Sequence, residues 1–104
     1  MMLLSKNRYS VGDLISLKLV TSEEIVARLK EETDTTYTIE RPVMLVPTHQ
    51  GTAIAPFMIT ADVADTLVIG KNMVITVAQT KKEIETAYIE ATTGISTINS
   101  NIVR

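Results

Sequence analysis

DLISLKLVTSEEIVARLKEETDTTYTIERPVMLV, residues 13–46, decides the fold because it predicts three consecutive β-strands. Polar and apolar residues alternate from Ser16 to Leu19, which is the period-two pattern of a strand with one buried face. The alternation returns over residues 25–31 and again over residues 36–40. Short polar stretches separate the three segments and have the length of hairpin loops.

A helix competes with the second of these strands. Ser22, Glu23 and Glu24 could begin a helix over residues 22–32. The β-branched pair Ile25–Val26 and the period-two pattern favour a strand, because the helix propensity of Glu and Lys is only a weak prior. We therefore expect a strand in which Ile25 and the apolar residues in register with it share one face.

The β pattern continues into the second half of the chain. Residues 52–60 predict a fourth strand, which Pro56 interrupts as Pro42 interrupts the third. Proline cannot donate to a strand ladder, so we expect a strongly bent pair of strands, as small barrels require. A short apolar run at 66–69 and a strand at 73–78 follow. Because residues 73–78 are almost continuously apolar, we expect that strand to be covered on both faces.

Residues 47–51 predict a polar loop between the third and fourth strands, with Pro and Gly at its ends. This loop holds His49, the only histidine of the chain. A lone histidine without clustered carboxylates or cysteines cannot build a metal site, so we expect His49 to be exposed.

The period changes at Thr80, where a helix is predicted over residues 81–93. Thr80 and Glu83 have the spacing of a capping box, and Gly94 is well placed to end the helix. The apolar positions at i, i+3, i+4 and i+7 are Ile84, Ala87, Tyr88 and Ala91. This stripe is narrow, so we expect the helix to pack on the barrel or on a neighbouring subunit. Residues 95–104 form a Ser- and Asn-rich tail.

Composition indicates one folded domain over residues 1–104. The chain is 45% hydrophobic and 21% charged, which excludes a mainly disordered protein. It has no cysteine, and no apolar run approaches the ~20 residues of a membrane span. We expect a cytoplasmic protein without a cofactor. No catalytic motif is present, so we expect no enzymatic activity.

Two motifs resemble those of the Sm-like (Lsm/Hfq-type) family. In order along the chain they are Gly12-Asp13-Leu14, Leu17-x-Leu19, Ala27-x-Leu29 and a turn with Asp34, then Leu67-Val68-Ile69, Gly70-Lys71-Asn72 and Met73-Val74-Ile75-Thr76-Val77. The resemblance covers residues 11–78 and is greatest to the divergent Sm-like proteins of tailed phages. It implies a small, five-stranded, strongly bent antiparallel barrel of the SH3 type, here with one C-terminal helix.

The sequence departs from the family's pattern at the RNA site in particular. The Asn that contacts RNA in many members falls on Thr38 or Glu40, and the Arg-Gly pair of the second motif becomes Gly70-Lys71. The family's glycines in the first motif are Ser22 and Ala27 here, and the Asp of its third loop is Asp34 only with one inserted residue, or Thr33 without it. The helix follows the barrel, whereas most members carry it before. The inference about the fold is therefore stronger than the inference about RNA.

The resemblance implies a cyclic homo-oligomer of about five to seven subunits, in which the fourth strand of one subunit pairs with the fifth of the next. Loops 34–37 and 70–72 would face its pore and bind single-stranded RNA. Tyr37 would stack on a base, Lys71 would neutralise a phosphate and Asn72 would hydrogen-bond a base edge, beside Thr38.

Two functions stay open at this point. One is a ring-shaped RNA-binding, riboregulatory module, and the other is a structural or protein-interaction ring without RNA. Tyr37 has a structural interpretation as a strand aromatic that packs on its neighbours, and Lys71 has one as a solvated turn cation. The acidic residues Glu31, Glu32 and Asp34 predict a solvated turn and argue against strong RNA affinity.

Overall fold

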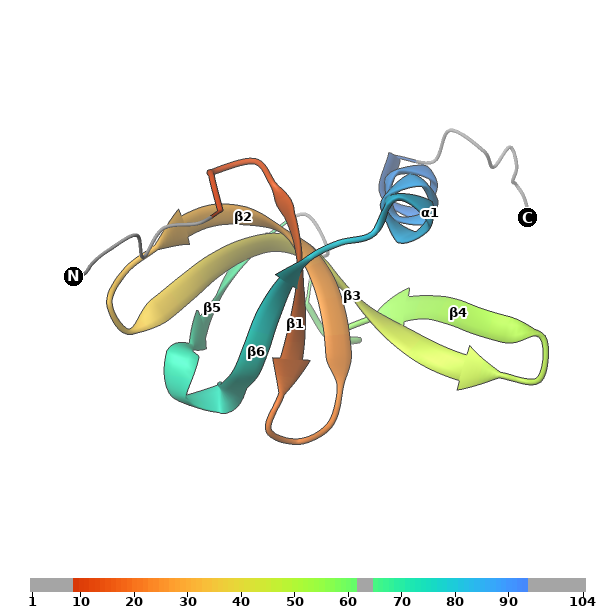
Figure 1. Ribbon diagram of the computed structural model, residues 1–104, viewed down its shortest axis with the longest axis horizontal. Helices are drawn as coiled ribbons and strands as arrows, with labels where there is room; N and C mark the ends of the chain where they lie inside the picture. Colours follow the sequence, from red (N-terminus) through yellow and green to blue (C-terminus); the bar gives the residue numbers. More distant parts are fainter. Residues whose placement is uncertain (1–8, 62–64, 94–104) are drawn as a thin grey trace.

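The computed structural model describes residues 9–61 and 65–93, which form a six-stranded antiparallel sheet followed by one helix (Figure 1). The strands are β1 (Leu14–Leu19), β2 (Glu24–Glu32), β3 (Thr36–Thr48), β4 (Gly51–Pro56), β5 (Thr66–Gly70) and β6 (Val74–Gln79). A single 3₁₀ turn, η1 (Lys71–Met73), joins the last two strands, and the helix is α1 (Lys82–Thr93). The predicted fold class, mostly β with one C-terminal helix, is confirmed.

The sheet is strongly bent because β3 is long and has different partners along its length. The order is β4-β3-β2-β1-β6, and β5 also pairs with β3. Residues 36–40 of β3 pair with β5, and residues 43–48 pair with β4. Strand β2 pairs with the other edge of β3. The strands β4 and β5 therefore lie end to end along the remaining edge of β3. They fill one strand position, so that six segments build the predicted five-stranded sheet.

A β-bulge bends β3 at the position that proline predicted. Val26 pairs with Val43 and Arg28 with Glu40, so that Arg41 and Pro42 together lie opposite one residue of β2. Arg41 has a φ of 52°, which places its backbone in the left-handed region. The predicted irregularity at Pro42 is therefore confirmed as a bulge.

The larger hydrophobic core lies inside the bend and follows the predicted alternation. Its buried members are Ile15, Leu17, Leu19, Ile25, Ala27, Leu29 and Ile39. Residues 22–32 form no helix, because Ile25, Ala27 and Leu29 reach this core together only in an extended chain. The sheet is open between β5 and β6, which have no ladder to each other in the described part of the chain.

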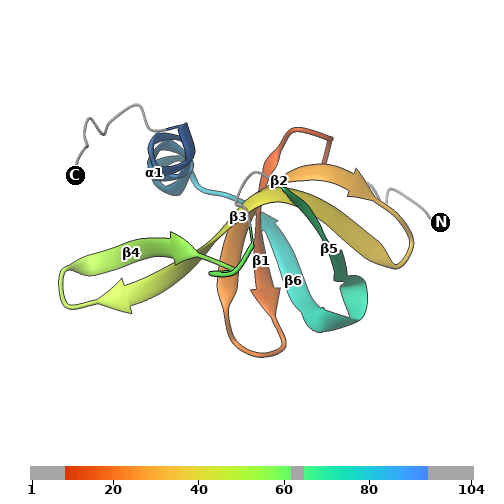
Figure 2. The same ribbon diagram turned by 180° about the vertical axis from the view of Figure 1, so that it is seen from behind.

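Helix α1 covers the outer side of the bend and completes a second hydrophobic cluster (Figure 2). Tyr88 is fully buried there against Leu14, Val26 and Val43. The Tyr88 hydroxyl donates to the carbonyl of Arg41 at 2.8 Å and lies 3.2 Å from that of Glu40, both at the bulge. The helix thus packs on its own barrel, as one of the two predicted alternatives stated.

The predicted capping box is wrong. The helix begins at Lys82, and the N–H of Glu85 donates to the carbonyl of Lys81 at 2.9 Å. Thr80 lies before the helix and is buried, with its hydroxyl oxygen 2.9 Å from that of Ser16 on β1. A partner on the sheet has displaced the local cap. Gly94 and the tail at 95–104 lie outside the described residues.

The loop between the third and fourth strands is shorter than predicted. Strand β3 extends to Thr48 and β4 begins at Gly51, which leaves His49 and Gln50 as a two-residue turn. Gly51 has a φ of 123°, a conformation that side chains rarely tolerate. His49 is exposed, as expected. Strand β4 ends at Pro56, before the predicted limit of residue 60.

The prediction that residues 73–78 are covered on both faces is wrong for the single chain. Among the described residues, β6 pairs only with β1. Ile75 is 61% exposed and Met73 is 43% exposed. The apolar run therefore reflects a surface that one copy of the chain leaves open.

Two negative findings apply to residues 9–61 and 65–93. Their one α-helix is too short and too polar to span a bilayer. They also hold no group of three or more His, Cys, Asp or Glu side chains arranged to bind a metal ion.

Candidate functional site

The two loops that the sequence analysis assigned to RNA converge in space. Strand β5 pairs with the start of β3, so that Gly70 lies opposite Thr36. The backbone N–H of Lys71 then donates to the carbonyl of Thr35 at 2.8 Å. The turn η1 is thus attached to the β2–β3 hairpin, and the predicted meeting of these loops is present in one chain.

Lys71 is held by two neighbours at this junction. Its Nζ lies 2.7 Å from Oε2 of Glu32 and 5.0 Å from the centre of the Tyr37 ring. The hydrogen bond to Glu32 raises the pKa of Lys71. The side chain of Glu32 is 12% exposed, so the prediction that Glu32 belongs to a solvated turn is wrong. Most of the charge that Lys71 could offer to a phosphate is already neutralised.

Tyr37 is a packed side chain with a cation over its ring. It is half-buried and contacts the larger hydrophobic core. Burial raises the pKa of its hydroxyl, and the nearby Glu32 carboxylate raises it further. A base that stacked on the face of the Tyr37 ring under Lys71 would have to displace the lysine. The geometry therefore agrees with the structural interpretation of Tyr37.

The other two predicted site residues, Asn72 and Thr38, do not contact the Lys71–Glu32 pair in the same way as Tyr37. Asn72 is exposed on the same turn as Lys71, and its Oδ1 is 2.5 Å from where a Cβ would stand at Gly70. The amide thus folds back over a residue without a side chain. Thr38 follows Tyr37 on β3 and therefore points to the opposite face of the sheet. The structure brings Tyr37, Lys71 and Asn72 to one place and leaves Thr38 outside it.

Glu32 is the site residue that sequence reasoning missed. It pairs with Tyr37 across the β2–β3 hairpin. Residues 33–36 close the hairpin between this pair, whereas a turn limited to residues 33–35 would set Glu32 opposite Thr36, so the predicted turn gave no sign of the contact.

The second notable surface is formed by two unpaired strand edges. In the described part of the chain, β5 pairs only with β3 and β6 only with β1, so each has one edge without a strand partner, although the carbonyl of Val77 on β6 accepts from the Tyr9 hydroxyl at 3.4 Å. Val68 on β5 is 66% exposed, and Ile75 and Met73 at β6 are similarly open. A cavity of about 340 Å³ beside β5 has Leu19, Phe57 and Met73 in its lining. Exposed apolar edges of this kind are a hazard for a chain that stays alone.

Comparisons with known proteins find one kind of similarity. No protein-family model matches the chain, and no curated protein does. Among solved structures, the chain is similar to a heptameric archaeal Sm protein, with 16% sequence identity and a TM-score of 0.48. The match covers 69% of this chain and 91% of that one.

Proposed function

We propose that the protein is a ring-forming homo-oligomer with a structural or protein-interaction role. The free edge of β5 in one subunit pairs with the free edge of β6 in the next. One observation carries this proposal: among the described residues neither edge has a strand partner, and both strands carry exposed apolar side chains, Val68 on β5 and Ile75 on β6.

The two edges are different surfaces, so the contact between them is head-to-tail. Contacts of this type close into rings when the rotation per subunit fits, and they then leave no edge free. Closure would cover the apolar run of β6 that the sequence predicted to be buried.

Val68→Glu should abolish the closed ring, so that the mass of the ring disappears. An unpaired carboxylate at the β5 edge would lose its water on assembly, at a cost of several kcal/mol per contact. The association constant should fall at least about a hundredfold at each contact. Native mass spectrometry and sedimentation at micromolar concentration measure the result.

Val11→Glu is the matched control for this experiment. Val11 is 68% exposed and Val68 is 66% exposed, but Val11 lies in the turn before β1 and belongs to neither β5 nor β6. Val11→Glu should keep the wild-type mass. A wild-type mass for Val68→Glu, or a single-chain mass for the wild type, would disprove pairing through these edges.

A second candidate function, binding of single-stranded RNA, is favoured by the meeting of the two loops at Lys71. The bound position of Lys71 argues against strong affinity, because Glu32 already neutralises it and Glu31 and Asp34 stand nearby in sequence. For this reason the ring without RNA comes first. The RNA site, if used, consists of Tyr37, Lys71 and Asn72.

Glu32→Gln should raise the affinity for uridine-rich single-stranded RNA several-fold at low salt. The substitution releases Lys71 to a phosphate, and each released contact should steepen the slope of log K against log salt by ~0.7. Glu31→Gln makes the same charge change at an exposed neighbour and should have little effect. Fluorescence anisotropy over a salt series measures both variants.

The reverse experiment removes the site. Tyr37→Ala combined with Lys71→Ala should abolish whatever RNA binding Glu32→Gln reveals. RNA affinity that is unchanged in this double variant would place any RNA site elsewhere on the protein.

A further inference from the structure

The second half of β3 and β4 form an arm that extends away from the rest of the sheet (Figures 1 and 2). We define the arm as residues 43–56. No Asp, Glu, Lys or Arg occurs from Pro42 to Ala61, although 21% of the chain is charged. A projecting hairpin is usually the place for solvated charges, so this composition indicates that the arm is not surrounded by water alone.

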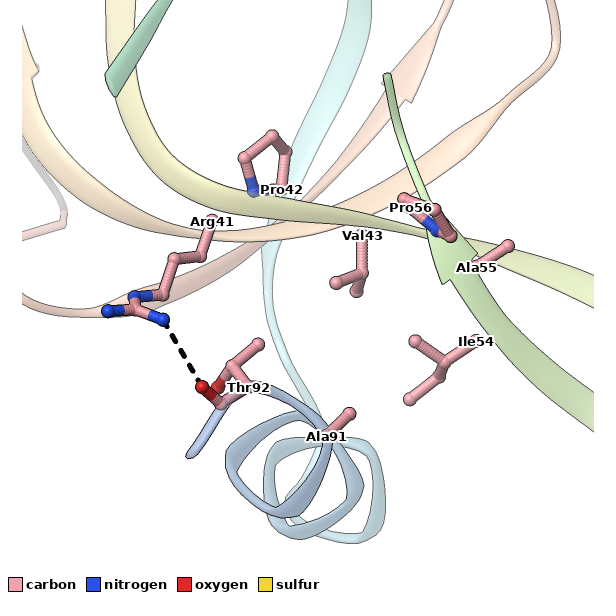
Figure 3. A pocket seen from close by; sticks show the side chains of 8 residues that line it. All are labelled: Arg41, Pro42, Val43, Ile54, Ala55, Pro56, Ala91 and Thr92. Atoms are coloured by element: carbon pink, nitrogen blue, oxygen red, sulfur yellow. Dashed lines mark hydrogen bonds between the residues drawn. The ribbon is translucent and has the colours of Figure 1, made fainter. Parts of the chain in front are cut away.

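Helix α1 covers one face of the arm. Leu45 and Ile54 pack with Ile84 against the second hydrophobic cluster. A groove of about 280 Å³ continues along this face, with Val43, Ile54 and Ala91 directed into it (Figure 3). Arg41 closes one end by donating to the carbonyl of Thr92 at 3.2 Å. This face of the arm therefore already has a partner within the chain.

The opposite face of the arm is not covered by α1, although Met44 at its base packs against the larger hydrophobic core. Residues that alternate with those on the helix face are Met44, Val46, Ala53 and Ala55. Ala53 is exposed and the other three are half-buried. The side chains are small or apolar, so a second sheet or strand could approach this face closely.

The outer edge of β4 is also free. In the described part of the chain, β4 pairs only with β3, through registers that include Pro47 opposite Thr52. The two-residue turn makes Thr48 and Gly51 a hydrogen-bonded pair, so the next pair, Pro47 and Thr52, is not hydrogen-bonded. This agrees with Pro47, which has no N–H to donate. The N–H of Thr52 accordingly points away from β3 and toward any strand added there.

We propose that the β4 edges of two copies of this chain pair antiparallel about a two-fold axis and join two rings into one assembly. A two-fold contact is self-complementary, with residue i of one copy against residue j of the other and j against i, whereas a charged partner would need opposite charges on this edge. The segment from Pro42 to Ala61 carries no such charge, while the whole chain has a net charge of −2. This absence favours a second copy over a charged partner as the occupant.

The pairing does not depend on the ring, although the mass of the final assembly rests on the proposed function. The β4 edge and the β5 and β6 edges are separate, so each can be removed without the other. With both contacts present, the wild type should have twice the mass of one ring.

Thr52→Pro should halve the mass of the assembly, because it removes an outward N–H that the β3–β4 ladder does not use. Thr52→Ala keeps this N–H and should keep the full mass. Ala53→Glu is a second variant, which brings a carboxylate from each copy into the otherwise uncharged contact and should also halve the mass. Circular dichroism of each variant verifies that the sheet is folded.

Combining Thr52→Pro with Val68→Glu distinguishes the β4 contact from the β5–β6 contact of the ring. Val68→Glu alone should give a dimer through β4, and Val68→Glu with Thr52→Pro should give single chains. A wild-type mass for Thr52→Pro and Ala53→Glu would overturn pairing through β4 and leave the ring intact. A wild-type mass for Val68→Glu would instead overturn the ring and leave the β4 pairing to be judged by the arm variants.

Cross-linking gives an independent measurement, because the chain has no cysteine. Single cysteines at positions 52 to 55 should include one close enough to the two-fold axis to form a disulfide-linked dimer under mild oxidation. Thr86→Cys, on an exposed part of α1, should form none. A wild type that contains one ring and gives no cross-link at any of the four positions would exclude a second copy as the occupant of this edge.

Discussion

Tyr88→Ala is expected to lower the free energy of unfolding by about 3–5 kcal/mol, the range for deletion of a large buried aromatic side chain. Tyr88 is fully buried and is the contact through which α1 packs on the sheet. Its loss would leave a cavity beside Val26 and Val43 and remove the hydroxyl from the bulge. Urea unfolding at one fixed protein concentration measures the change, since oligomer formation makes stability depend on concentration.

Tyr88→Phe separates the hydroxyl from the ring. It should cost about 1–3 kcal/mol, because the carbonyls of Arg41 and Glu40 lose their donor at a place that water reaches poorly. Ile89→Ala on the same helix should cost about 0.5 kcal/mol or less, as Ile89 is largely outside the packed face. Equal losses for Tyr88→Ala and Ile89→Ala would show that α1 does not stabilise the sheet through Tyr88.

The features that could be predicted from the sequence are those that depend on the pattern of neighbouring residues. Alternation in residues 13–46 specified the strands and their buried faces, and Pro42 specified the bend. The period of the helix specified Tyr88 as a core-facing residue, since a single stripe has only one apolar side. In each case the information lies within a few residues, where backbone geometry and side-chain polarity act together.

Contacts between distant segments were not predictable in this way. Thr80 has the spacing of a cap, but its hydroxyl finds Ser16 on β1, and only the tertiary fold brings the two together. Lys71 was assigned to a phosphate, but its Nζ lies 2.7 Å from Oε2 of Glu32, a partner from another strand. Local propensity is overridden where a buried polar group has a better partner across the sheet.

The error on residues 73–78 has a different origin. Apolar composition predicts that a surface is covered but does not say by what. The strand is open in one chain because its cover is supplied by another copy, according to the proposed ring. The same reasoning applies to the arm, where an uncharged segment from Pro42 to Ala61 leaves an edge and a face free. If the proposed contacts form, the structure of one chain shows less burial than the assembly has at these surfaces.

Ile39→Ala should lower the free energy of unfolding by about 2–5 kcal/mol and should also weaken the ring. Ile39 is fully buried on β3, opposite Leu29 of β2 on one side and Leu67 of β5 on the other. Truncation leaves a void at the point where the β5 edge joins the core. Since β5 has no other strand partner in the described residues, it should loosen before the rest of the sheet. Urea unfolding and native mass spectrometry measure the two effects on the same samples.

Ile39→Val distinguishes lost packing from a lost strand. It keeps the branched shape at the same position, so it should cost about 0.5–1.5 kcal/mol and leave the assembly mass unchanged. Hydrogen exchange should rise in β5 before β1 and β2 in Ile39→Ala, because β5 depends on this one contact to the core more than they do. If Ile39→Ala unfolds more easily but keeps its ring at every concentration at which it is folded, then the β5 edge does not hold the subunits together, and the assembly must use another surface.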